Sequence, residues 1–167
     1  MSLEQSLKPF PLSAQDYAAR FPEIRVQLDW ARFGAESWPV NHGVVEDAAE
    51  LGSLRSAFWV RFRRLNPRFL KTIGTRSLSI AEVAARIAQF PEPGRGHIVN
   101  LVQCYRAEGR AEVDAPAYRL ADGTFLILDA NHRSTALALA GVPFRLHLYV
   151  IMGPADHAFR GMKFPAI

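Results

Sequence analysis

Hydrophobic and polar positions are patterned most regularly in the last third of the chain. Residues 117–120 and 124–128 are apolar runs on either side of Asp122-Gly123, a pair that supplies the positive-φ positions of a tight hairpin turn. Residues 131–140 are rich in alanine and leucine and are followed by Gly141. This pattern predicts two paired strands and then a helix with a defined end.

Three helix signals lie earlier in the chain. Residues 79–90 open with a Ser-x-x-Glu capping box, carry an apolar stripe and end at prolines, which predicts a helix followed by a loop at 91–96. Apolar residues at helical spacing predict a second helix from about 98 to Gly109. A similar box from Ser13 to Asp16 predicts a short helix over 13–20.

The longest predicted helix spans residues 44–65. Its apolar positions follow the spacing of four and three residues that marks one helix face, although Gly52-Ser53 weakens the pattern, and Pro67 stops it. The preceding residues 23–41 are irregular, and their aromatic side chains are expected to pack onto the main core. The apolar positions of the helix are Val44, Ala48, Leu51, Phe58, Phe62 and Leu65, and the aromatic side chains are Trp30, Phe33 and Trp38.

The order of these elements indicates the α+β class. The apolar run at 144–152 predicts a final strand, which returns beside the hairpin by way of a crossover helix and so gives a small mixed β-sheet with flanking helices. A chain of 167 residues is long enough for one core but short for two. We expect a helical, arginine- and aromatic-rich N-terminal extension at 1–77, a core at 78–152 and an irregular tail at 153–167.

Composition favours a folded protein. Hydrophobic residues make up 49% and charged residues 22%, and no stretch reaches the length of apolar sequence that spans a membrane. Without a signal-peptide pattern at the start, a soluble, cytoplasmic protein with no membrane partner is expected. The single cysteine, Cys104, has no second cysteine to pair with and is expected to be a small buried hydrophobe.

Positive charge gathers in one segment, although the net charge is only +4. Between Glu50 and Glu82 the chain has seven basic residues, no acid and several aromatic residues, a mixture that can bind phosphates and stack on bases. The alternative is that these bases are the solvated side of a helix. The candidate nucleic-acid contacts are Arg61, Arg63, Arg64, Arg68 and Lys71.

A second candidate site lies where the predicted strand runs into the helix at 131–140. The first N–H groups of a helix lack partners and form an anion site, yet here the first turn carries cations, which the helix dipole disfavours. A bound phosphate resolves this conflict, with Arg133 binding two oxygens and His132 and Asn131 adding donors. Asp129 would then hold a metal ion, act as a general base or cap the helix. The alternative is that Asp129 is simply the N-cap residue and the cations are solvated.

The segment YRLADGTFLILDANHRSTALALAGVP, residues 118–143, resembles the core of the ParB/sulfiredoxin-like superfamily. The likeness covers about residues 78–152 and is strongest over 117–152. Members bind nucleotide phosphates at this helix start and include partition CTPases, sulfinic acid reductases, free-serine kinases and some nucleases. The resemblance implies catalytic roles for Asp129 and His132 and a site for ATP or another nucleotide with Mg²⁺. Its implied nucleotide-binding residues are Asn131, His132, Arg133, Ser134 and Thr135.

Departures from the family pattern narrow the expected activity. Asn131 stands where sulfiredoxins have their reactive cysteine, and few residues follow Met152 where partition proteins continue into further domains, so neither activity is expected. Ala130 replaces the usual glycine. Kinase-like members use a second carboxylate, for which the candidates are Glu92, Glu108, Glu112 and Asp114.

The other histidines are weaker candidates. His97 follows a glycine-rich loop and could line the site, although a loop histidine more often has no such role. His42, His147 and His157 lack partners at metal-ligand spacing, His147 is expected to be packed or hydrogen-bonded, and no metal site is predicted.

Two main hypotheses follow. The first is a nucleotide-binding protein, a Mg²⁺-dependent phosphotransferase or nucleotide hydrolase that acts on a small-molecule acceptor. The second is a non-enzymatic nucleic-acid-binding or regulatory module that uses the basic segment. A protein-binding scaffold built on the aromatic N-terminal region is a third.

Overall fold

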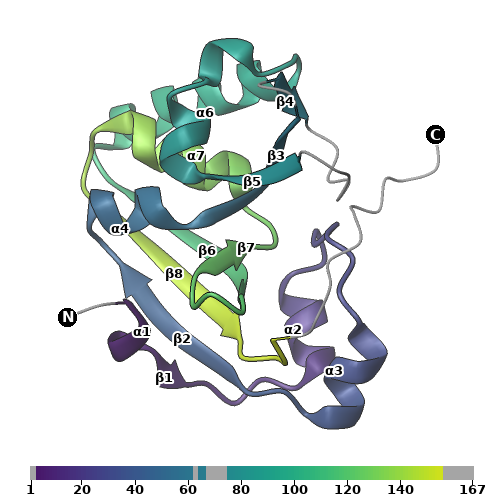
Figure 1. The fold of residues 1–167 in the computed structure, drawn as a ribbon. Coiled ribbons are helices and arrows are strands. Elements are labelled where there is room, and N and C mark those ends of the chain that lie inside the picture. Colours follow the sequence, from purple (N-terminus) through teal and green to yellow (C-terminus); the bar gives the residue numbers. More distant parts are fainter. Residues whose placement is uncertain (1–2, 62–63, 67–74, 156–167) are drawn as a thin grey trace.

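The computed structural model describes residues 3–61, 64–66 and 75–155, and these form the expected α+β architecture of a mixed sheet with flanking helices (Figure 1). The helices are α1 (Leu3–Ser6), α2 (Ala14–Arg20), α3 (Trp30–Glu36), α4 (Ala48–Ser53), α5 (Ile80–Ala84), α6 (Gly94–Glu108) and α7 (Asn131–Ala140), with a 3-10 turn at Ile87–Gln89. The strands are β1 (Lys8–Pro9), β2 (Val40–Val45), β3 (Arg55–Arg61), β4 (Arg64–Asn66), β5 (Thr75–Ser79), β6 (Ala111–Arg119), β7 (Phe125–Ile127) and β8 (Phe144–Ile151).

All eight of these strands belong to one sheet. The order is β1-β2-β8-β6-β7-β3-β4, with β5 also paired to β3. The pairs β6/β8 and β3/β7 are parallel, and the others are antiparallel. Since β8 returns beside β6 after α7, the predicted crossover connection is confirmed.

Local signals predicted several elements well. Strands β6 and β7 form the hairpin, with Gly123 at a φ of 81° in the turn. Helix α7 has the predicted bounds and ends at Gly141, whose φ of 68° is a conformation that glycine adopts without steric cost. Ser79 and Glu82 form both hydrogen bonds of the capping box at the start of α5. Ser13 caps α2.

The helix predicted over residues 44–65 is wrong. That stretch contains the end of β2, the short helix α4, β3 and the start of β4. Strand β2 pairs with β8 along its whole length, and β3 pairs with β4, β5 and β7, so long-range pairing overrides the helical spacing. The N-terminal extension is therefore not purely helical, because its strands complete the sheet formed by residues 78–152.

Helices cover the two faces of the sheet unequally. Helices α4 to α7 lie over one face (Figure 1). There Leu51 of α4 and Leu137 of α7 share a core cluster with Val113 and Leu148. On the other face, the aromatic side chains of α2 and α3 cover one end of the strands, and the predicted packing of Trp30, Phe33 and Trp38 onto the core is confirmed there. The other end of this face carries polar side chains.

The prediction that Cys104 is buried is wrong, because its side chain is exposed on α6. The helix turns its apolar side, which includes Ile98 and Val102, toward α5 and α7. Cys104 lies on the solvent side of the same helix.

Candidate functional site

A cavity of about 450 Å³ lies at the start of α7. Four parts of the chain form its wall: the segment after α2, the middle of β3, the first half of α6, and the junction between β7 and α7. The lining residues are Glu23, Arg25, Ala57, Phe58, His97, Leu101, Leu128, Asp129, Ala130, Asn131, His132 and Arg133. All five residues of the predicted Asp-Ala-Asn-His-Arg motif therefore reach one cavity.

The backbone at this junction presents N–H groups that precede the first hydrogen bond of α7. Ala130 is the N-cap residue of α7, in the left-handed conformation with a φ of 66°, and makes no side-chain cap. The first helical hydrogen bond runs from the Ser134 N–H to the Ala130 carbonyl, at 2.8 Å. The N–H groups of Asn131, His132 and Arg133 precede that bond and so have no partner within the helix. The alternative in which Asp129 is the N-cap is therefore wrong.

Asn131 holds the junction in place. Its side chain is buried, the Oδ1 atom accepts a hydrogen bond of 2.9 Å from the Ala57 N–H, and the Nδ2 atom donates to the Ile127 carbonyl at 3.4 Å. The carboxamide, predicted as a phosphate donor, is thus committed to the backbone of two strands. Asn131 contributes to the cavity through its N–H and by fixing the position of the helix start.

His132 is packed among aromatic rings. Its ring centroid lies 5.4 Å from that of Phe58, 5.8 Å from that of Phe90 and 5.5 Å from that of His97. Burial lowers the pKa of His132, and the neighbouring His97 lowers it further, against an opposing effect of Asp129. The imidazole is therefore neutral at pH 7 and can donate a hydrogen bond without carrying a full charge.

Asp129 and Arg133 form a loose ion pair across one turn of α7. The Nη2 and Oδ2 atoms are 3.4 Å apart, and the two side chains are 27% and 43% exposed for Asp129 and Arg133, respectively. Such a half-exposed pair at this distance contributes little stability. Arg133 can leave Asp129 for an incoming anion at small cost.

Ser134 and Thr135 lie away from the cavity, although they were predicted to bind nucleotide. Both are fully buried, and neither lines the cavity. The Thr135 hydroxyl donates to the Asn131 carbonyl at 2.8 Å, while the Ser134 hydroxyl has no hydrogen-bond partner among the described residues. Their position on the core side of α7 leaves them no path to a ligand in this cavity.

Three ionisable lining residues, Glu23, Arg25 and His97, come from outside the motif. His97 was a weaker sequence candidate and does lie opposite His132. Glu23 and Arg25 were not predicted, because they lie in an irregular segment that is brought to the cavity only when the hydrophobic Val26 and Leu28 pack with α2 and α3. The signal available in the sequence was the alternation of Glu23 and Arg25 with apolar residues.

The carboxylates predicted to complete the site lie elsewhere. Glu92 accepts hydrogen bonds from Arg95 and from the Gly96 N–H at the start of α6. Asp114 pairs with Arg20, and Glu112 with His147. None of the four candidates, Glu92, Glu108, Glu112 or Asp114, lines the cavity.

Part of the basic segment, residues 62–63 and 67–74, lies outside the described residues. Arg63, Arg68 and Lys71 lie there, while Arg61 and Arg64 are opposite one another in the β3–β4 ladder. The tail at 156–167, with His157, also lies outside them. Nucleic-acid binding by this segment remains a prediction, to be tested by salt-dependent binding of mixed oligonucleotides.

The described residues lack two kinds of feature. Within residues 3–61, 64–66 and 75–155, no group of three or more His, Cys, Asp or Glu side chains is arranged to hold a metal ion. No helix in the same ranges has the length and apolar character needed to cross a bilayer.

Comparisons of the chain with protein-family models, with curated proteins and with solved structures found no match.

Proposed function

We propose that the cavity at the start of α7 binds the phosphate groups of a nucleotide, and that the chain is a phosphotransferase or nucleotide hydrolase acting on a small molecule. One observation carries the proposal: three helix-start N–H groups, two arginines and a neutral histidine line the same cavity. Donors and positive charge at a helix N-terminus form an anion site. The resemblance to the ParB/sulfiredoxin-like superfamily supports the same assignment.

Arg133 and Arg25 have complementary positions. Arg133 projects from α7 beside the N–H groups, while Arg25 comes from the segment after α2, so a ligand between them is bound from two sides. A guanidinium binds two phosphate oxygens in parallel, which fixes the orientation of the ligand as well as adding affinity. His132 donates a hydrogen bond without adding charge.

Asp129 and Glu23 supply the acidic side of the cavity. Mg²⁺ is usually bound in proteins by one or two carboxylates together with substrate phosphates and water, and Asp129 and Glu23 are the carboxylates of this cavity that would take part in such a site. A bound Mg²⁺ ion would neutralise part of the phosphate charge. Asp129 is also placed to accept a proton from an attacking hydroxyl group or water.

A thermal-shift panel tests binding. ATP, ADP, CTP and GTP, each with and without Mg²⁺, are added to the wild type, to Arg133→Ala and to Arg145→Ala, a matched control in an exposed ion pair away from the cavity. A ligand at 100 times its Kd stabilises the native state by about 2.7 kcal/mol, or several degrees in Tm. We expect one nucleotide to raise the Tm of the wild type and the control, and not that of Arg133→Ala.

Equal shifts in all three proteins would place the nucleotide elsewhere. If no nucleotide shifts the wild type, the phosphate-site proposal fails, and the basic segment becomes the candidate to test with oligonucleotides.

Turnover is tested separately from binding. With the nucleotide identified, phosphate release or transfer is followed in the wild type and in Asp129→Asn. We expect Asp129→Asn to lose most of the rate and keep Mg²⁺-independent binding, because the amide cannot accept the proton. An unchanged rate would exclude the role proposed for Asp129.

A further inference from the structure

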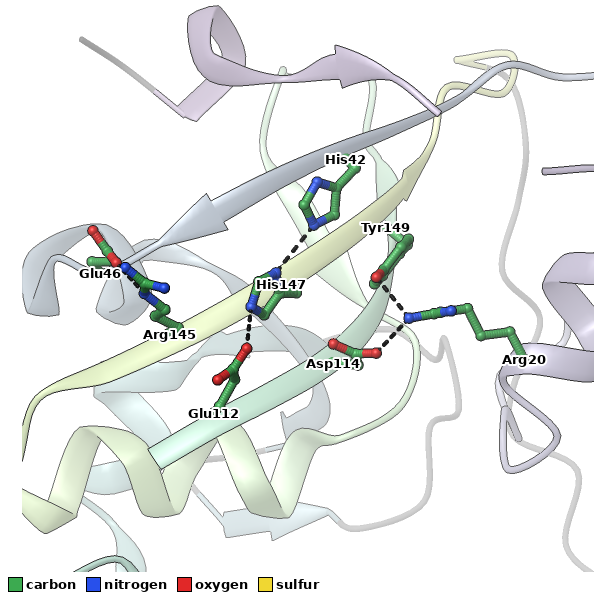
Figure 2. Close-up of polar contacts among 8 residues, drawn as sticks. All are labelled: Arg20, His42, Glu46, Glu112, Asp114, Arg145, His147 and Tyr149. Carbon is green, nitrogen blue, oxygen red and sulfur yellow. Dashed lines mark hydrogen bonds and ion pairs between the residues drawn. The ribbon is translucent and has the colours of Figure 1, made fainter. Parts of the chain in front are cut away.

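The end of α2 is joined to the sheet by contacts that meet on one tyrosine of β8. The Tyr149 carbonyl accepts a hydrogen bond of 2.6 Å from the Tyr17 hydroxyl. The Tyr149 hydroxyl accepts one of 2.7 Å from Arg20 Nη2, and the guanidinium lies 4.4 Å from the centre of the Tyr149 ring (Figure 2). The Phe21 ring packs against the same ring, with centroids 5.4 Å apart. The last turn of α2 therefore rests on β8.

Arg20 also reaches a second strand. Its Nη2 atom lies 2.7 Å from Oδ2 of Asp114 on β6, so one guanidinium bridges β6 and β8 (Figure 2). Glu112, two residues away and so on the same face of the sheet, is already paired with a histidine: His147 Nε2 lies 2.8 Å from its Oε1 atom. The other nitrogen of that ring, His147 Nδ1, lies 3.2 Å from His42 Nε2. Of these two carboxylates of β6, Asp114 is therefore the one left for Arg20.

The residues directly after Arg20 form one wall of the α7 cavity. Glu23 and Arg25 line that cavity, and neither side chain has a hydrogen bond or an ion pair within the part of the chain that the structure describes. Their positions therefore depend on how the backbone is held. Phe21 and Val26 are buried on either side of them, but such apolar contacts have no preferred direction.

We propose that Arg20 is a positioning residue for the cavity at α7, because its contacts fix the direction in which the chain leaves α2 and so place Glu23 and Arg25 in the wall. Glu23 is three residues from Arg20, and a chain of that length spans at most about 11 Å, so a shift at the end of α2 displaces it. The effect on ligand binding rests on the nucleotide site proposed above, whereas the position of the wall does not.

The contacts of Arg20 can be removed without unfolding the protein. The side chains of Arg20 and Asp114 are 39% and 42% exposed, so water screens their attraction and the pair contributes little to the stability of the whole fold. Helix α2 stays attached through the buried Tyr17 and Phe21. A substitution of Arg20 should therefore loosen the cavity wall and leave the fold intact.

An NMR titration of His132 in the ligand-free, full-length protein tests the position of the wall. Burial and the neighbouring His97 lower the pKa of His132, and the charge of Arg25 lowers it further. We expect Arg20→Gln to raise this pKa toward the value measured in Arg25→Gln, because Arg25 is then held less closely. Arg20→Lys keeps a charged donor for Asp114 and should lie closer to the wild type.

The matched control is Arg145→Gln. Arg145 pairs with Glu46 at 2.7 Å on the same sheet face, away from α2, and its loss should leave the pKa of His132 unchanged (Figure 2). Circular dichroism confirms that each variant is folded. The proposal is overturned if the pKa of His132 in Arg20→Gln equals that in the wild type, or if Arg145→Gln raises it as much.

Nucleotide affinity, measured by calorimetry, tests the consequence for binding. We expect the nucleotide that stabilises the wild type to bind Arg20→Gln about 3–10-fold more weakly, the size of a lost exposed ion pair and cation–π contact, and to bind Arg145→Gln equally well. Wild-type affinity in Arg20→Gln would overturn the role of Arg20 in binding. If the wild type binds no nucleotide, the proposed function fails, and the titration of His132 still decides whether Arg20 positions the wall.

Discussion

The cavity at α7 and a polar row of His42, His147 and Glu112 on the opposite sheet face both centre on histidines, but their polar groups are paired differently. In the cavity, helix-start N–H groups have no helical partner, and Arg133 makes only a loose ion pair. In the row, short contacts of 2.7–3.2 Å join His42, His147 and Glu112 to one another and Arg20 to Asp114. The first arrangement leaves donors for a ligand from outside. The second satisfies itself, so a ligand there has to displace an existing contact.

The largest stability difference between the two regions is expected at Asn131. Asn131→Ala removes a buried acceptor and leaves the Ala57 N–H unsatisfied, which costs about 2 kcal/mol in the free energy of unfolding. Urea denaturation measures it. Asn100→Ala, at an exposed position of α6, is the control and should change stability by less than about 0.5 kcal/mol. A loss below 0.5 kcal/mol in Asn131→Ala would mean that the helix start is held by other contacts.

Acid should distinguish the two histidine regions next. Burial lowers the pKa of both His132 and His42, so in each case the unfolded chain binds the proton more readily than the folded one. The contribution of each residue to stability is thus fully present above the ordinary pKa of 6.5 and decreases as pH falls below it. His132 is the more deeply packed of the two.

Urea unfolding from pH 8 to pH 5 measures this dependence. His132→Gln should flatten the loss of stability at acid pH, and His42→Gln should flatten it less. The opposite ranking would show that the His42–His147 pair, and not the cavity, is the main acid-sensitive element.

The cavity's motif could be predicted from the sequence because it lies within local signals. The turn at Gly123, the helix stop at Gly141 and the charges on the first turn of α7 are all set by residues close in the chain. Asp129 was assigned three roles from spacing alone. The structure removes the capping role, since Ala130 is the N-cap.

The rest of the site depends on contacts between distant residues. Glu23 enters the cavity because the segment after α2 packs on the sheet, and His42 meets His147 because β2 pairs with β8. The 44–65 prediction failed for the same reason: apolar spacing describes a possible helix face, but strand partners far along the chain decide the structure.

A smaller change in the free energy of unfolding, of the opposite sign, is expected at Ala130. Its left-handed φ of 66° costs an alanine about 1–2 kcal/mol, and glycine avoids this while losing part of the gain to its greater flexibility when unfolded. Ala130→Gly should therefore raise the free energy of unfolding by about 0.5–1 kcal/mol. Urea midpoints measure it. Gly141→Ala, at the other end of α7 with a φ of 68° and open space around it, should lower stability by a similar amount.

The smallest effect is expected in the ion pair between Arg145 and Glu46, beside the polar row. The Nε and Oε1 atoms are 2.7 Å apart, but the side chains are 64% and 58% exposed, so water and salt screen the attraction. Arg145→Ala should change the free energy of unfolding by less than about 0.5 kcal/mol. A change above 1 kcal/mol, with a matching coupling energy in a double-mutant cycle with Glu46→Ala, would show that the exposed charges of this face act as one network. The polar row would then stabilise the sheet cooperatively.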